Sequence, residues 1–229
     1  MSKLVEYAFE DSVAIIRMDD GKANAMSYAM LANINAALDH AELDEAKAIA
    51  VVGRDGKFSA GFDLSIMGQG REAAADLLNE GSRLALRLYE LPASLVLGVT
   101  GHALAMGALL LLTADERIGA QGPFKVGLNE VKIGMAMPAM GVQLAEDRIA
   151  RRFVTRAVVN AELFTPSEAI EVGFIDRVVD LEHVPTVAIA MAKTLAADLH
   201  SNALAETKIR LRANRAANIR RIISESTSV

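Results

Sequence analysis

Hydrophobic and polar positions alternate with two different periods along this chain. Near the N-terminus, a period of two predicts a hairpin of strands Leu4–Phe9 and Val13–Met18, with its turn at Glu10–Ser12. Ala48–Val52 is predicted to be a short buried strand and Leu95–Thr100 another apolar strand. Two further short strands are predicted at Arg117–Ala120 and Asp176–Val179. These runs are too short for buried helices, so we expect them to form the centre of a sheet.

Helical spacing separates the predicted strands. Ser27 can cap a helix that runs to about Leu43, with Met30, Leu31, Ile34 and Leu38 on one face. An amphipathic helix is predicted from about Arg71 to Leu91, where Pro92 ends it, and later helices at Pro166–Val172, Val184–Leu199 and Ala203–Ile223. Strands that alternate with helices predict an α/β fold with a largely parallel, covered sheet. We expect a core in residues 1–150 and a mainly helical region in residues 151–229.

Composition excludes several classes of protein. The chain has 229 residues, 52% of them hydrophobic, which fits one compact domain. Its longest apolar run ends at Asp115–Arg117 before it could span a bilayer, and its first residues lack the pattern of a signal peptide. The chain has no cysteine, and its four histidines show no ligand spacing, so we expect no metal site and a cytoplasmic location. A net charge of -5 argues against nucleic acid as a partner.

Charge is unevenly distributed near the C-terminus. Residues 206–221 carry six cations and one anion, Glu206; the cations are Lys208, Arg210, Arg212, Arg215, Arg220 and Arg221. A solvated helix face is one interpretation, and a site for phosphates or a neighbouring subunit is the other. The sequence leaves both open.

Two loops rich in small residues carry the candidate chemistry. Gly101–Leu112 begins as a turn and continues as an almost wholly apolar helix, and Lys57–Leu64 is a similar loop between a strand and a helical region. The first N–H groups of a helix have no partner within it, and small residues let a ligand approach them. Two such donors aimed at one point would form an oxyanion hole.

Four segments together resemble the crotonase superfamily, the enoyl-CoA hydratases and isomerases. They are Phe58–Leu64, Gly101–Gly107, Gly127–Glu130 and Thr165–Asp176, which match the family motifs in order and spacing over nearly the whole chain. The resemblance implies a crotonase-like spiral of ββα units with a helical C-terminal region. It also implies an acyl-CoA thioester as substrate, no cofactor beyond the CoA of the substrate, and a homotrimer or a dimer of trimers built through residues 151–229.

The resemblance also assigns roles to individual residues. The backbone N–H groups of Phe62 and Met106 would form the oxyanion hole, with Gly61 and Gly107 placed where a Cβ would obstruct the turns. Glu130 matches a family glutamate and would be the catalytic base.

A departure from the hydratase pattern occurs at Leu109, where the matching position in hydratase-type members is a second glutamate. Leu109 lies three residues after Met106, so we expect it on the same helix face. A single carboxylate, Glu130, against an apolar wall should have a raised pKa suited to proton exchange. This combination favours a Δ3–Δ2 enoyl-CoA isomerase. Hydration or another enolate reaction, and a pseudo-enzyme that binds acyl-CoA without turnover, remain alternatives.

Substrate-binding loops are implied by the same match. Lys22 and Ala23, together with the stretch from Ala60 to Leu64, resemble the loops that hold CoA through backbone contacts. Lys22 could reach a phosphate or could be a solvated turn residue. Asp63 could contact the ligand or cap the following helix. Asp115 is expected to be structural.

Overall fold

Two sheets of unequal size form the framework of the chain. The structure is a computed structural model that describes residues 4–226. The larger sheet has the order β1-β2-β3-β5-β7-β9, formed by Val5–Glu10, Val13–Met18, Ala48–Val52, Ser94–Val99, Glu116–Ala120 and Arg177–Val179. The smaller sheet has the order β4-β6-β8, formed by Gly56–Ser59, Gly101–Leu104 and Val126–Gly127. The β1/β2 pair is antiparallel and the other paired strands are parallel.

Three successive units each place one strand in each sheet and then form helix. β3 and β4 precede α2 (Leu64–Met67) and α3 (Arg71–Glu90). β5 and β6 precede α4 (Met106–Leu111), and β7 and β8 precede α5 (Ala139–Arg148). This repeat confirms the predicted α/β fold of ββα units. Its consequence is that the loops after β4, β6 and β8 lie at one edge of the small sheet.

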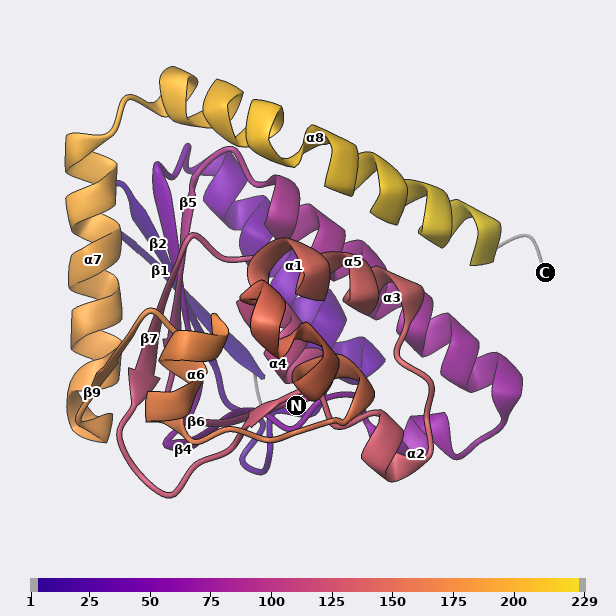
Figure 1. Ribbon diagram of the computed structural model, residues 1–229. Helices are drawn as coiled ribbons and strands as arrows, with labels where there is room; N and C mark the ends of the chain where they lie inside the picture. The colour runs from indigo at the N-terminus through magenta and orange to yellow at the C-terminus, as the bar shows by residue number, and fades with distance from the viewer. Residues whose placement is uncertain (1–3, 227–229) are drawn as a thin grey trace.

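Helices cover both faces of the large sheet (Figure 1). On one face, α7 (Val184–Asp198) packs Ala188, Ala192 and Ala196 against the side chains of the sheet. These alanines recur every four residues, so they share one helix face and allow close approach. The opposite face carries the larger core, to which α1 (Tyr28–Leu43), α3 and α4 contribute.

Local sequence signals set the ends of several elements. In the hairpin, Asp11 and Ser12 have φ of 50° and 63°, as a tight turn between two twisted strands requires. The Ser27 side chain accepts a hydrogen bond from the Met30 N–H and begins α1 as predicted. Thr165 and Glu168 form a reciprocal capping box at the start of α6 (Pro166–Val172).

The basic C-terminal segment forms α8 (Ser201–Ser226), which lies along α3 and α5 (Figure 1). The interpretation as a solvated face is wrong for Lys208 and Arg212, whose exposed fractions are 7% and 5%. Both cations bind Asp115 at 2.7 Å, and Arg212 also lies over the ring of Tyr89. Asp115 is therefore structural, as predicted, and it joins α8 to the start of β7.

The other four cations of this segment also pair with carboxylates. Arg215 binds Glu146 of α5 and Arg220 binds Glu90 of α3. Arg210 and Arg221 pair with glutamates one turn away on α8 itself. Four of the six cations, Lys208, Arg212, Arg215 and Arg220, thus hold α8 on the body of the protein. Within residues 4–226, no helix combines the length and the apolar character that crossing a bilayer would need.

Candidate functional site

The loop after β4 lies directly against the end of β6. Gly61 has φ of +95°, and a Cβ placed on it would lie 2.9 Å from the Ala105 Cβ and 3.5 Å from the Met106 nitrogen. The Gly61 Cα is therefore within about 5 Å of that nitrogen, since a Cα–Cβ bond adds about 1.5 Å. The structure thus brings together the two loops singled out from the sequence.

The strand geometry around Phe62 fixes the direction of its N–H. Met26 donates to the Gly61 carbonyl at 2.8 Å and accepts from the Asp63 N–H at 3.3 Å. Successive N–H groups of an extended chain point to opposite sides. The Phe62 N–H therefore points away from Met26.

Met106 is the first residue of α4, so its N–H has no acceptor inside the helix. The preceding residue, Ala105, has φ of 48° and ψ of -122°, an uncommon conformation for a residue with a Cβ. This conformation sets the plane of the Ala105–Met106 peptide bond. Among the hydrogen bonds formed by residues 4–226 in turns, loops and side chains, neither the Phe62 N–H nor the Met106 N–H is a donor.

A cavity of about 80 Å³ lies beside these two loops, and we call it the Glu130 cavity. It is lined by Ala60, Phe62, Leu64, Met67, Leu78, Ala105, Asn129, Glu130, Ile133, Met135 and Pro138. Within this lining, which lies wholly in the described part of the chain, Glu130 is the only titratable residue. The cavity thus combines one acid with an otherwise mostly apolar wall.

Glu130 is 3% exposed, and its Oε2 has no hydrogen-bond partner among the residues that the structure describes. Burial disfavours the ionised form and raises the pKa of this carboxyl group from 4.5 to about 7. Asn129, its neighbour, also has a buried side-chain oxygen without a partner in the described chain. Buried polar atoms left unpaired are rare in folded proteins and point to a ligand at this cavity.

The raised pKa of Glu130 makes a stability prediction that is independent of function. The folded state binds the proton more tightly than the unfolded state, so wild-type stability should fall as pH rises from about 4.5 to about 7. Glu130→Gln does not titrate. As pH rises through this window, the difference between its free energy of unfolding and that of the wild type should therefore increase in favour of the variant, by about 3 kcal/mol in total. Urea unfolding at several pH values measures the difference, and two parallel pH profiles would contradict the burial of an ionisable Glu130.

Asn24 and Ser59 form a buried polar frame that the sequence did not reveal as such. Both residues are fully buried. The Asn24 amide donates to the carbonyls of Met18, Lys57 and Phe58, and Ser59 donates to the Asn24 carbonyl and accepts from the Gly61 N–H. This frame ties the loop after β2 to β4 and to the turn at Gly61. Its only sequence signal is an amide and a hydroxyl inside small-residue loops.

The predicted CoA-binding loops lie next to each other. The Ala60 N–H donates to the Ala23 carbonyl at 3.0 Å, and Arg54 donates to the Lys22 carbonyl at 2.6 Å. Asp63 caps α2 by accepting from the backbone and side chain of Ser65, which is one of the two alternatives for this residue. Leu64 is 68% exposed at the rim of the Glu130 cavity.

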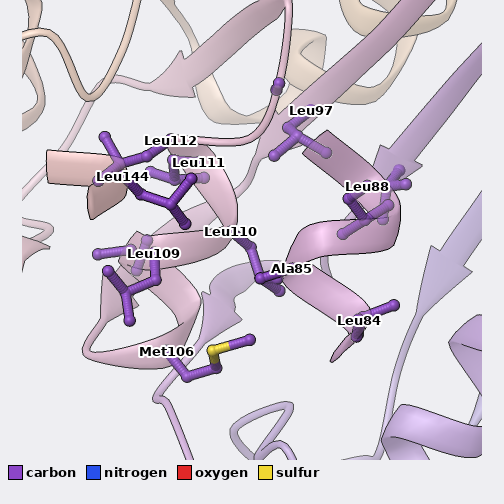
Figure 2. Packing of buried hydrophobic residues seen from close by; sticks show 14 of the residues in the cluster. Leu84, Ala85, Leu88, Leu97, Met106, Leu109, Leu110, Leu111, Leu112 and Leu144 are labelled. Atoms are coloured by element: carbon purple, nitrogen blue, oxygen red, sulfur yellow. The ribbon is translucent and has the colours of Figure 1, made fainter. Parts of the chain in front are cut away.

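Gly107 and Leu109 lie behind the cavity. A Cβ on Gly107 would meet the Ser59 carbonyl oxygen at 2.5 Å, so its absence lets α4 pack on β4. Leu109 is fully buried and packs against Gly141 of α5, and it does not line the Glu130 cavity. Figure 2 shows Met106 and Leu109 leaving α4 in different directions, so they do not share one face as expected. They differ because two residues three positions apart are rotated by about 60° on a helix, enough to reach different neighbours.

Five apolar lining residues were not predicted from the sequence: Met67, Leu78, Ile133, Met135 and Pro138. They come from α2, from α3 and from the irregular segment between β8 and α5. Only Leu78 carried a signal, as part of the amphipathic pattern of α3. The others lie in segments without a clear period.

Comparisons with known proteins agree on one family. The sequence model described as enoyl-CoA hydratase/isomerase matches residues 8–226. A human protein, mitochondrial enoyl-CoA delta isomerase 1, is 34% identical over 212 residues, which are 90% of this chain and 70% of the human one.

Solved structures give the same result. An enoyl-CoA isomerase from Mycobacterium tuberculosis has a TM-score of 0.94 and 38% identity, covering 100% of this chain and 99% of that one. The human mitochondrial delta3-delta2-enoyl-CoA isomerase has a TM-score of 0.88 and 29% identity, covering 97% and 92%.

Proposed function

Because this chain belongs to the enoyl-CoA hydratase/isomerase family and is an enzyme of that type, we propose that it is a Δ3–Δ2 enoyl-CoA isomerase. One observation carries the choice within the family. Glu130 is the only titratable residue among the described residues that line the cavity, and it is buried without a hydrogen-bond partner for Oε2. A double-bond shift needs one acid–base group, which removes a proton from one carbon and returns it to another. Addition of water is easier with two acid–base groups that share the proton transfers.

The first role in this proposal belongs to the backbone. Removing a proton next to a thioester places negative charge on the carbonyl oxygen, and fixed N–H donors stabilise that charge without reorganising. The N–H groups of Phe62 and Met106 are suited to this role because neither has an acceptor in the turns and loops described above. Ala105, with its positive φ, and Gly61 hold the two donors in position.

The second role belongs to Glu130, which moves the proton. As the carboxylate it takes a proton from C2 of a 3-enoyl-CoA. The electron pair of the broken C–H bond forms the C1–C2 double bond of a dienolate, and the carbonyl π electrons move to the oxygen. The proton then passes from Glu130 to C4, where the C3–C4 π electrons form the new C–H bond, while the C1–C2 π electrons shift to C2–C3 and the thioester carbonyl is restored. A pKa of about 7 suits both steps, because the group gains and loses a proton near neutral pH.

The third role is the placement of CoA. The loop at Lys22 and Ala23 and the stretch from Ala60 to Leu64, including Gly61 and Asp63, would hold the nucleotide and pantetheine through backbone contacts. Two hydrogen bonds support this assignment. The Ala60 N–H donates to the Ala23 carbonyl, which joins the two loops, and Arg54 donates to the Lys22 carbonyl. CoA enters as part of the substrate, and no further cofactor is required for this step.

The hydratase alternative depends on a second acid. Hydratase-type members carry glutamate at the position of Leu109, and a buried leucine can neither bind nor activate water. Leu109 therefore favours isomerisation, and by shaping the core behind Met106 it would act on the site indirectly. Assembly as a homotrimer or a dimer of trimers, and a cytoplasmic location, remain predictions from the sequence.

A product assay tests the proposed reaction against both alternatives. Purified protein is incubated separately with a 3-enoyl-CoA and with a 2-enoyl-CoA, and products are identified by chromatography and NMR. We expect conversion of the 3-enoyl to the 2-enoyl compound and no 3-hydroxyacyl-CoA. Formation of the hydroxy product would favour a hydratase, and binding of both compounds without turnover would favour a pseudo-enzyme.

Isotope transfer sharpens this assay. A 3-enoyl-CoA deuterated at C2 should give a product with part of the deuterium at C4, because a 3% exposed carboxyl group exchanges slowly with solvent. Complete loss of label to water would argue against a single shielded proton carrier.

A further inference from the structure

A second cavity begins where the Glu130 cavity ends. It measures about 200 Å³ and lies between α3, α5 and the last turns of α8, so we call it the α8 cavity. Its lining is Ala75, Leu78, Asn79, Ser82, Pro138, Ala139, Met140, Ile222, Ile223 and Ser226. Leu78 and Pro138 line both cavities, so these two residues form the partition between them.

The two sides of the partition differ in their freedom to move. Pro138 is the N-cap residue of α5, and its side chain has little freedom because the ring is closed onto the backbone nitrogen. Leu78 projects from α3, is only half-buried, and can change rotamer on a short timescale. On α3, Ala75, Leu78 and Ser82 are spaced three and four residues apart, so they form one stripe along the helix. The route past the partition therefore runs along α3.

Seven of the ten residues that line the α8 cavity are apolar, which suits a hydrocarbon chain. The three polar residues are Asn79, which is half-buried, and two serines. Ser82 donates its hydroxyl to the Leu78 carbonyl, and Ser226 donates to the Ile222 carbonyl. These donors are thus satisfied within their own helices and need no partner in the cavity. The far wall is held in place because Arg215 binds Glu146 of α5 and Arg220 binds Glu90 of α3.

The Glu130 cavity alone is small for its proposed task. Ligand pockets commonly measure roughly 300–1,000 Å³, and this cavity has about 80 Å³. The carbons that react must lie beside Glu130, and the rest of an acyl chain needs additional room. The α8 cavity, on the other side of Leu78 and Pro138, is the adjoining space that could hold the rest of the chain.

We propose that Leu78 sets the acyl-chain length of the substrate: short chains stop at Leu78, and longer straight chains displace it and extend into the α8 cavity. The proposal rests on the proposed function, since it concerns the same substrate. It makes α8, from the C-terminal end of the chain, a wall of the binding site for the distal carbons. The substrate class is then straight-chain enoyl-CoA with a flexible apolar tail.

Four variants test the proposal through the ratio of kcat/KM for 3-dodecenoyl-CoA to that for 3-hexenoyl-CoA. Leu78→Ala opens the partition and should raise the ratio, by about fourfold for each methylene that gains a place in the α8 cavity. Leu78→Phe closes the partition and should lower it. Ile222→Trp fills the α8 cavity and should lower the ratio, and it should cancel the gain when combined with Leu78→Ala.

A matched control lies on the same helix. Leu211 is 75% exposed on α8 and lines neither cavity, so Leu211→Trp should keep the wild-type ratio. The proposal is overturned if Leu78→Ala and Leu78→Phe shift the ratio in the same direction, or if Ile222→Trp leaves the gain of Leu78→Ala intact.

Binding measurements separate this proposal from the proposed function. Affinities of saturated acyl-CoAs with six to twelve acyl carbons, measured by calorimetry, require no turnover. If the wild type shows no isomerase activity, the proposed reaction fails, while the chain-length profile of binding in the same variants still decides the role of Leu78.

Discussion

Glu130→Gln should lower kcat for conversion of a 3-enoyl-CoA by about 10²–10⁴-fold, the usual contribution of a positioned acid or base. Glutamine has nearly the same shape as glutamate but cannot take the proton from C2. The two backbone N–H donors and the loops that would hold CoA are unchanged, so a 2-enoyl-CoA should still bind. Steady-state kinetics measure the loss, and calorimetry measures the retained affinity.

A surface glutamate provides the control for this change. The Glu206 side chain is 67% exposed on α8, far in sequence from the cavity, and pairs with Arg210. Glu206→Gln should therefore match the wild type in both assays. If Glu130→Gln keeps more than a tenth of wild-type kcat, Glu130 is not the proton carrier.

Gly61→Ala is expected to lower kcat/KM by about 10²–10³-fold, as the loss of one oxyanion donor does. The new Cβ would lie 2.9 Å from the Ala105 Cβ and 3.1 Å from the Leu104 carbonyl oxygen, which is closer than side chains pack. The strand end at Phe62 and the turn before Met106 would have to move apart. Kinetics with a 3-enoyl-CoA measure the effect, and thermal unfolding shows whether the fold is retained.

Gly56 separates the clash from backbone strain. Its φ of +76° also disfavours a side chain, but among residues 4–226, apart from Gly56 itself and its two chain neighbours, no heavy atom lies within 4 Å of the position of its Cβ. Gly56→Ala should therefore lose stability, by about 1–2 kcal/mol, and retain most of its activity. If both variants lost the same activity, the loss in Gly61→Ala could not be attributed to a change in the spacing of the two loops.

Long elements with a clear period were predictable from the sequence. The helices at Tyr28–Leu43 and Arg71–Glu90 begin and end within a residue of the predicted limits, because a serine cap and a proline mark them. The small sheet was not predicted. Its strands have two to four residues and contain glycine, so Gly101–Leu104 was interpreted as a turn before a helix. Strands this short have no detectable period.

Partners across the fold explain what else the sequence could not show. Lys208 and Arg212 share one helix face, which predicts a charged face but says nothing about Asp115, some 90 residues earlier. Leu109 and Met106 are likewise close in sequence, but the sequence does not show that Met106 contacts Gly81 of α3 and Leu109 contacts Gly141 of α5. The burial of Glu130, in contrast, agrees with the prediction of a carboxylate against an apolar wall.

The Asn24 amide, with its three carbonyl acceptors, has a consequence for engineering. Because it clamps the Met18 end of the hairpin to Lys57 and Phe58, the loop that would meet the nucleotide and the turn that would meet the thioester belong to one rigid body. Redesigning this chain for a different carrier group cannot treat the two ends of the substrate as independent modules. A substitution that displaces one of the two loops would also displace the other, so functional variants should be those that keep the Asn24 hydrogen bonds.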